Sequence, residues 1–178
     1  KTEIPVALAM RYGEMTIEKG PQELHEQGVT EVLPFPLYPQ YAMASTLTIL
    51  VLAEEIRKKK FPQMKFTDVP AFYNKPDYIQ NLADLMQKSL EGYDYDQLVF
   101  SYHGIPERHI RKTDVTKSHC KIDGSCCSTP SAAHAFCYRH QCYETTRLVA
   151  EKLQIPKDKY CLTFQSRLAG DKWLDPYT

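Results

Sequence analysis

The stretch LVFSYHGIP, residues 98–106, ends an apolar run on a histidine and then breaks at Gly104 and Pro106. The apolar residues 98–100 are typical of a buried strand, whereas glycine and proline interrupt regular structure. In open parallel sheets, ligands bind beyond the carboxyl ends of the strands. His103 therefore lies where a base or a metal ligand would act, the alternative being a histidine that only caps the strand.

The segments on either side of this stretch alternate between strand and helix patterns. Short, bounded apolar runs predict buried strands, and apolar residues spaced three and four apart predict amphipathic helices. We expect strands at 5–10, 30–35, 65–69, 97–102 and 160–164, and helices at 14–27, 43–60, 77–90 and 142–153. This order predicts an α/β fold with mainly parallel sheets flanked by helices.

Composition limits the classes of protein to which the chain can belong. Its 178 residues suit one large domain or two small ones, and 43% hydrophobic residues are enough to build a core. A net charge of zero gives no broad attraction to nucleic acid. No apolar run is long enough to span a bilayer and no secretory signal is present, so we expect a cytoplasmic protein.

A run of four basic residues, 57–60, closes the helix expected at 43–60. Cations stabilise the last turn of a helix through its dipole, and this is the interpretation we prefer. The alternative is a patch that binds anionic membranes.

Cysteine is concentrated in one segment of the chain. Five of the six cysteines follow the spacing C-x5-C-C-x9-C-x4-C, and they are Cys120, Cys126, Cys127, Cys137 and Cys142. Without a secretory signal, a disulfide framework is the weaker interpretation. Four thiolates suit a [2Fe–2S] cluster or a structural zinc ion, and the alternative is that some of these cysteines are ordinary buried thiols.

Four segments of the sequence together resemble ferrochelatase, the family that inserts ferrous iron into a porphyrin at the end of haem synthesis. They are AMRYG (9–13), LPFPLYPQYAMAST (33–46), VFSYHGIPERH (99–109) and LTFQSRLAGDKWLDPYT (162–178). The resemblance implies two similar Rossmann-like lobes with a porphyrin cleft between them. Residues 1–70 correspond to the later part of the first lobe and residues 71–178 to the earlier part of the second, with a cysteine-rich insertion at about 115–142.

The resemblance also implies that the chain is a central fragment, incomplete at both ends. One lip of the cleft would then be missing, and so would an acidic residue beyond Thr178 that faces the catalytic histidine in the family. We therefore expect the fragment to be inactive alone.

Residue roles follow from the same resemblance. His103 matches the catalytic histidine, which accepts pyrrole protons or holds the entering iron. Arg11 would pair with a propionate and Tyr12 would line the route of the metal. Gln165, Ser166 and Trp173 match a segment of the cleft in the second lobe, and Trp173 would pack on the macrocycle. The alternative for Trp173 is plain core packing.

The cofactor implied is an internal [2Fe–2S] cluster, which some bacterial members carry in such an insertion. Four of the five clustered cysteines would hold it, and Cys142 is the least diagnostic because relatives without the insertion can share it. Met43 stands where animal enzymes have a cluster ligand, so the animal-type cluster is not expected.

Two other functions stay open, a redox-sensing or zinc module built on the cysteines and a related chelatase that acts on coproporphyrin. The partners expected are porphyrin and ferrous iron, with no nucleic acid. The apolar porphyrin favours a peripheral association with the inner membrane, although no segment shows one, and the sequence specifies no oligomeric state.

Overall fold

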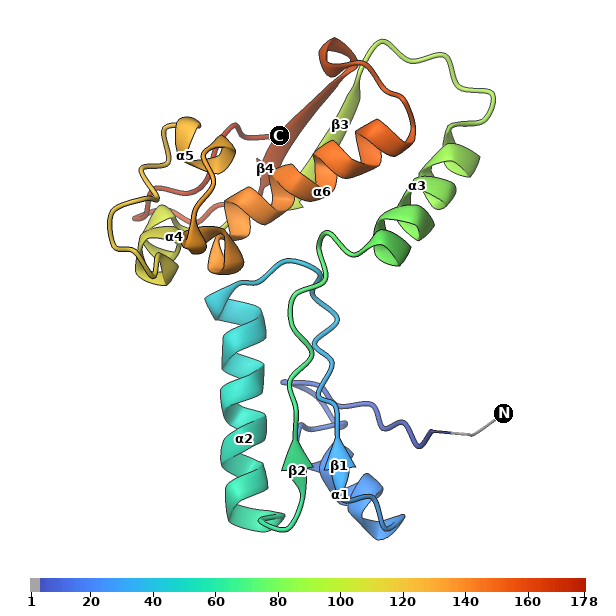
Figure 1. Ribbon diagram of the computed structural model, residues 1–178, viewed down its shortest axis with the longest axis vertical. Coiled ribbons are helices and arrows are strands. Elements are labelled where there is room, and N and C mark those ends of the chain that lie inside the picture. The colour runs from blue at the N-terminus through green and yellow to red at the C-terminus, as the bar shows by residue number, and fades with distance from the viewer. Residues whose placement is uncertain (1–3) are drawn as a thin grey trace. The chain divides into compact units, whose positions relative to one another are not determined.

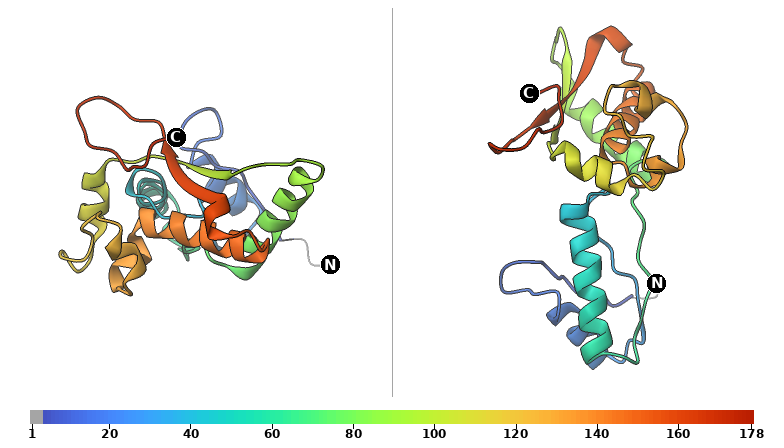
Figure 2. Two further views of the ribbon diagram at one scale, coloured as in Figure 1. Left: turned by 90° about the horizontal axis from the view of Figure 1, so that it is seen from above. Right: turned by 90° about the vertical axis from the view of Figure 1, so that its left-hand side faces the viewer.

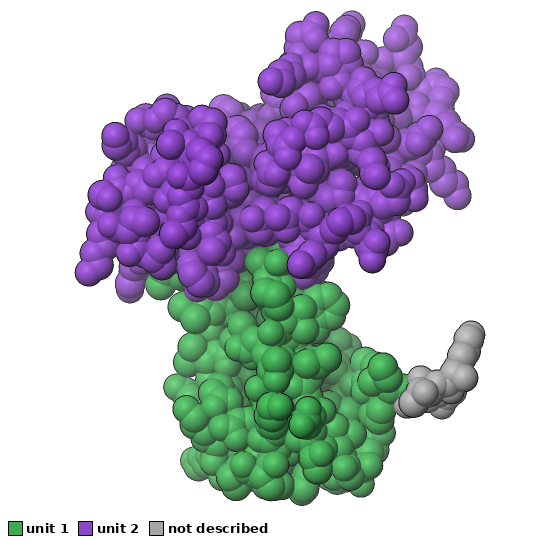
Figure 3. All heavy atoms as spheres, in the orientation of Figure 1, with its two compact units in different colours: residues 1–39, 43–71 green, residues 40–42, 72–178 purple. Residues whose placement is uncertain are grey.

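The computed structural model describes residues 4–178 and divides the chain into two compact units (Figure 3). One unit comprises Lys1–Pro39 and Met43–Ala71, and the other comprises Gln40–Ala42 and Phe72–Thr178. Each unit contains a two-stranded parallel sheet flanked by helices, which confirms the predicted α/β fold (Figure 1). The first three residues of the expected first lobe lie outside the described residues.

The first unit is built around a short parallel strand pair. Its elements are α1 (Lys19–Glu26), β1 (Glu31–Val32), the π-helical turn η1 (Met43–Leu47), α2 (Thr48–Lys60) and β2 (Lys65–Phe66). β1 pairs with β2 in the register Glu31 to Lys65 and Val32 to Phe66. Leu24, Phe61 and Met64 form the buried core beside this pair.

The strand predicted at 5–10 is wrong. Residues 4–9 have no regular structure, and Met10 makes only an isolated parallel bridge with Thr16. Val6 is 83% exposed and Leu8 is 57% exposed, whereas Ala7 packs against the core of the unit. A strand needs a neighbouring strand to satisfy its backbone groups, and among the described residues a single bridge, from Met10 to Thr16, is too little to make one.

The basic run lies in the last turn of α2, as the dipole interpretation predicts. Arg57 pairs with Glu54 at 2.6 Å and donates to the carbonyl of Met64 at 3.0 Å. Lys60 pairs with Glu18. Lys58 also pairs with Glu54, at 3.5 Å.

The second unit carries the segments with candidate site residues. Its elements are α3 (Pro76–Leu90), β3 (Leu98–His103), α4 (Glu107–Thr113), α5 (Ser125–Ser128), the 3-10 turn η2 (Ala132–Phe136), α6 (Tyr138–Lys152), the 3-10 turn η3 (Lys157–Lys159) and β4 (Tyr160–Gln165). β3 and β4 pair in parallel from Leu98 with Tyr160 to His103 with Gln165. Both strands therefore end at the same edge, and α6 lies along the pair (Figures 1 and 2).

Helix α6 begins one turn earlier than the sequence predicts, at Tyr138 instead of Cys142. Cys137 is its N-cap, and the sulfur accepts the backbone N–H of His140 at 3.5 Å. The cysteine segment is thus attached directly to the start of the helix (Figure 2, where α4 and α5 lie near this end of α6).

The core of the second unit lies under the carboxyl ends of β3 and β4. Phe164 and Leu174 are almost fully buried there together with Ile110, Cys137 and Cys142. Packing of this kind fixes the strand ends and the cysteine segment as one body. Within residues 4–178, no helix is long and apolar enough to cross a membrane.

Candidate functional site

His103 ends β3 with its imidazole held in one tautomer. Its Nδ1 lies 2.7 Å from the carbonyl oxygen of Gly104. A carbonyl only accepts, so Nδ1 carries the proton and donates it. In the neutral ring Nε2 then has the free lone pair, and the side chain is exposed at the sheet edge. The geometry suits a proton acceptor or a metal ligand.

Gly104 lets the chain turn closely against the end of β4. Its N–H donates to the carbonyl of Gln165 at 2.7 Å. A Cβ at this position would lie 2.9 Å from the carbonyl oxygen of Ser166 and 3.1 Å from that of Gln165. Ser166 itself adopts a φ of +67°, which a non-glycine residue rarely does. The turn therefore depends on glycine, and it brings Gln165 and Ser166 beside His103.

Trp173 lies next to His103 because backbone contacts between residues 105–106 and residues 173–174 hold it there. Pro106 and Trp173 form an antiparallel bridge. The N–H of Leu174 donates to the carbonyl of Ile105 at 3.0 Å. The ring centroids of His103 and Trp173 are 6.4 Å apart with an interplanar angle of 56°. The indole Nε1 is buried without a hydrogen-bond partner among the described residues.

A buried carboxylate strengthens the same backbone contacts between residues 105–106 and 173–174. Glu107 is 3% exposed and accepts from Lys172 at 2.8 Å and from Arg111 at 2.9 Å. Its backbone N–H also donates to the carbonyl of Lys172 at 2.8 Å. Burial alone would raise the pKa of Glu107, but the two cations outweigh it and hold that pKa below its usual range.

Arg11 and Tyr12 belong to the first unit, where they are neighbours. The guanidinium of Arg11 lies 5.8 Å from the ring centroid of Tyr12 and donates to the carbonyl of Thr48 at 3.1 Å. Tyr12 is 80% exposed. Both side chains can meet a ligand, and Arg11 retains donors for an anionic group because its planar fork has five N–H groups.

Thiols gather where α5, the segment before it and the start of α6 meet. The thiol of Cys137 lies close enough to those of Cys120 and Cys127 to affect their pKa values. Burial, and next the charge of Asp114, raises the pKa of Cys120 to about 11. The contact with Cys137, together with burial, raises the pKa of Cys127 far above its usual range. Such thiols stay neutral unless a cation binds them.

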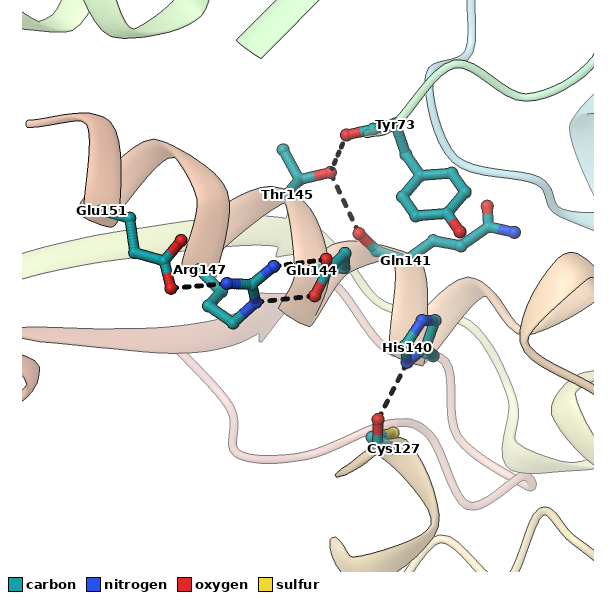
Figure 4. Close-up of polar contacts among 8 residues, drawn as sticks. All are labelled: Tyr73, Cys127, His140, Gln141, Glu144, Thr145, Arg147 and Glu151. Atoms are coloured by element: carbon teal, nitrogen blue, oxygen red, sulfur yellow. Dashed lines mark hydrogen bonds and ion pairs between the residues drawn. The ribbon is translucent and has the colours of Figure 1, made fainter. Parts of the chain in front are cut away.

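Histidine side chains fix the backbone of this segment. Nε2 of His119 and Nε2 of His134 both contact the carbonyl oxygen of Cys126, at 2.8 and 2.9 Å. Nδ1 of His140 contacts the carbonyl oxygen of Cys127 at 2.9 Å (Figure 4). Since carbonyls only accept, all three rings donate, so these nitrogens are not available as metal ligands.

Cys142 is fully buried, in the same core as Cys120 and Cys137. Burial raises the pKa of its thiol above the usual range. Over residues 4–178, no group of three or more His, Cys, Asp or Glu side chains is already arranged around a metal position. The thiols of Cys120, Cys127 and Cys137 are close together without forming such a position.

Two residues of this region carry contacts that the sequence pattern did not single out. Tyr138 donates its phenol O–H to the backbone carbonyl of His103 at 2.9 Å, and Arg139 donates to the sulfur of Cys127 at 3.4 Å. No sequence pattern marked them, because each contact joins residues that are far apart along the chain.

Comparison with known proteins gives one family. The family model described as Ferrochelatase matches residues 1–178. A ferrochelatase of Opitutus terrae is 43% identical over 176 residues, which is 99% of this chain and 51% of that protein. Ferrochelatases of Pseudomonas syringae pv. tomato and Pseudomonas entomophila are 41% and 43% identical over 98% of this chain. The chain spans about half the length of the curated relatives it matches.

Proposed function

The chain belongs to the ferrochelatase family, and from this membership we propose that the full-length protein inserts ferrous iron into protoporphyrin IX to give protohaem. The observation that carries the proposal is the fixed tautomer of His103, with Nε2 free at the exposed end of β3. The reaction is that of a metal-inserting lyase, with porphyrin and ferrous iron as substrates.

The chemistry requires a base at the face of the macrocycle. A porphyrin binds iron only after its two pyrrole N–H groups lose their protons, and a neutral imidazole near that face lowers the barrier. Nε2 of His103 accepts a pyrrole proton in this proposal, while Nδ1 keeps its own proton on the carbonyl of Gly104. The same lone pair offers a ligand to the entering iron.

Each unit has its own candidate substrate contacts in this proposal. Trp173 offers a flat surface next to His103, and Gln165 and Ser166 line the neighbouring turn. In the first unit, Arg11 pairs with a propionate and Tyr12 lines the route of the metal. What supports these roles is exposure, donor chemistry and the match to the family motifs.

The two units support an assignment to two lobes. We assign residues 1–70 to the later part of the first lobe and residues 71–178 to the earlier part of the second. The boundary between the units at Ala71 and Phe72 agrees with this division, and the segment 115–142 would be an insertion in the second lobe.

We also propose a [2Fe–2S] cluster in the insertion, held by four of the five clustered cysteines. What supports it is the closeness of the thiols of Cys120, Cys127 and Cys137. Thiolates are the usual ligands of such a cluster. Each nearby imidazole still has a second ring nitrogen besides the one that contacts a carbonyl. A bound cluster supplies one-electron chemistry and cross-links the segment. A zinc ion on the same thiols is the alternative.

We place this reaction in the cytoplasm, with peripheral attachment to the inner membrane through the apolar porphyrin. Co-sedimentation of the full-length protein with vesicles of inner-membrane lipid tests the attachment. Protein that binds these vesicles only when loaded with porphyrin would support it, and protein that stays in the supernatant in both cases would refute it.

Anaerobic incubation of the full-length protein with ferrous iron tests the function itself. We expect protohaem from protoporphyrin IX, followed by its visible absorption. Faster turnover of coproporphyrin would assign the protein to a related chelatase instead. No product from either porphyrin, with an intact cluster spectrum, would favour the redox-sensing module.

A further inference from the structure

Residues 105–107 and residues 172–174 run side by side next to His103, in opposite directions. Two backbone hydrogen bonds, of 2.8 and 3.0 Å, join the two segments. These bonds lie on either side of the bridge between Pro106 and Trp173, and they need no N–H from the proline, which has none. The backbone of Trp173 is therefore fixed by a hydrogen bond of the residue before it and one of the residue after it.

Two ion pairs of opposite sense connect the same part of the chain. Glu107 pairs with Lys172 at 2.8 Å, and the pair beside it joins Arg108 to Asp171 at 3.1 Å. A shift by one residue in one direction would place Arg108 opposite Lys172. A shift in the other direction would place Glu107 opposite Asp171. Like charges directly opposite each other are destabilising, so the charge pattern favours the observed register over both of its neighbours.

The pair of Glu107 with Lys172 is the stronger of the two. The side chain of Glu107 is 4% exposed, whereas the side chains of the other pair are 66% and 39% exposed. Exposed pairs contribute little, but a buried carboxylate that loses its partner is strongly destabilised. Arg111 also pairs with Glu107, at 2.9 Å, but both belong to α4. Of these two cations, Lys172 is the one that connects the buried carboxylate to residues 172–174.

The indole of Trp173 makes no hydrogen bond with the described residues, although its Nε1 is buried. It packs closely on Gly104, because a Cβ added to that glycine would lie 3.5 Å from Cε3 of the indole. The ring centroids of Trp173 and His103 are 6.4 Å apart. The position of the indole beside His103 therefore depends on packing and on the backbone that Lys172 anchors.

We propose that Lys172 is a positioning residue for iron insertion. Its ammonium, held by the buried carboxylate of Glu107, fixes the register of residues 172–174 and so keeps the indole of Trp173 beside His103. The inference rests on the proposed function, in which Trp173 offers a flat surface to the porphyrin. Lys172 itself contacts neither substrate, and its effect passes through Trp173, because reacting groups must be held in a fixed geometry.

Two measurements on the full-length protein test the inference. Fluorine NMR of protein labelled with fluorotryptophan reports the surroundings of Trp173, whose resonance is assigned by its loss in Trp173→Phe. Steady-state kinetics separate KM for protoporphyrin IX from kcat. We expect Lys172→Met to shift or broaden the Trp173 resonance and to raise KM about tenfold, the size of one lost aromatic contact, while kcat changes little. Lys172→Arg keeps a cation within reach of the carboxylate and should restore both values.

Arg111→Met is the matched control, because it removes the other cation from the same carboxylate. It should lower thermal stability but keep the wild-type resonance of Trp173 and the wild-type KM. If it shifts the resonance as much as Lys172→Met does, the ion pairs only stabilise the fold and the inference is wrong.

The remaining outcomes separate the inference from the proposed function. An unchanged resonance in Lys172→Met would overturn the inference whatever the kinetics show. A shifted resonance with wild-type KM would overturn the role of Lys172 in substrate binding. Wild-type protein that inserts no iron would refute the proposed function, and the NMR spectra would still decide whether Lys172 positions Trp173.

Discussion

The phenol of Tyr138 donates a hydrogen bond of 2.9 Å to the backbone carbonyl of His103. Tyr138 directly follows Cys137, the N-cap of α6, so one side chain joins the cysteine segment to the proposed catalytic histidine. The carbonyl belongs to the same peptide unit as the N–H of Gly104, which donates to Gln165. The contact therefore fixes the end of β3 from the side opposite to β4.

Removal of this hydrogen bond should lower activity without unfolding the protein. A net hydrogen bond contributes about 0.5–1.5 kcal/mol, so we expect Tyr138→Phe to reduce kcat for iron insertion by up to about tenfold. Tyr93→Phe, at a 73% exposed tyrosine, is the matched control. Wild-type kcat in Tyr138→Phe would show that the contact does not position His103.

Substitution of Gly104 should strain the turn. An added Cβ would meet the carbonyl oxygens of Ser166 and Gln165 at 2.9 and 3.1 Å, and neither can move without distorting β4. Overpacking of this kind costs about 1–3 kcal/mol. We expect Gly104→Ala to lower the melting temperature by several degrees, measured by thermal denaturation. An unchanged melting temperature would mean that the turn relaxes freely.

Glu107 should contribute stability that depends on pH. Its folded pKa lies below the usual value of about 4.3, so its contribution is present above that pH and is lost as the pH falls through the folded pKa. We expect Glu107→Gln to lower the free energy of unfolding by about 1–3 kcal/mol at pH 7, and by progressively less below pH ~4. Denaturant unfolding at several pH values measures this difference in the free energy of unfolding between the wild type and Glu107→Gln.

The exposed acid Glu151 provides the control for this experiment. It pairs with Arg147 at 2.5 Å with a side chain that is 61% exposed, and such surface pairs contribute about 0–1 kcal/mol. Glu151→Gln should therefore have little effect at any pH. If the loss in free energy of unfolding caused by Glu107→Gln stays constant from pH 7 to pH 3, the charge of Glu107 does not contribute to stability.

We expect four of the clustered cysteines to be ligands of the proposed cluster and the fifth not to bind it. We expect Cys120→Ser to abolish the visible bands of anaerobically purified protein, because the thiol of Cys120 lies close to that of Cys137. Cys142→Ala should keep those bands, since Cys142 is fully buried and is the least diagnostic of the five clustered cysteines. Bands that survive the first change and disappear with the second would reverse the ligand assignment.

The elements with their own periodicity could be predicted from sequence. The helix expected at 77–90 is α3, Pro76–Leu90, and the strand expected at 160–164 is β4, Tyr160–Gln165. Both have a complete apolar pattern and clear boundaries. The segment 5–10 has the same kind of pattern but forms no strand, because pairing depends on a neighbour and not on the segment itself.

Only some residues of the candidate site could be predicted from the sequence. His103 could be found because its strand, its glycine and its proline are consecutive. Arg139 could not, because the sulfur that it contacts, that of Cys127, belongs to another segment of the chain. Glu107 could not be predicted for a similar reason, because its partner Lys172 is far away along the sequence.

The most direct test of the central claim is the rate of iron insertion by full-length protein carrying His103→Ala. General base catalysis contributes about 10²–10⁴-fold, so we expect kcat to fall at least about 100-fold while porphyrin affinity, measured by fluorescence quenching, changes little. His25→Ala, at an exposed histidine of α1, should retain wild-type turnover. Wild-type turnover in His103→Ala would contradict the account.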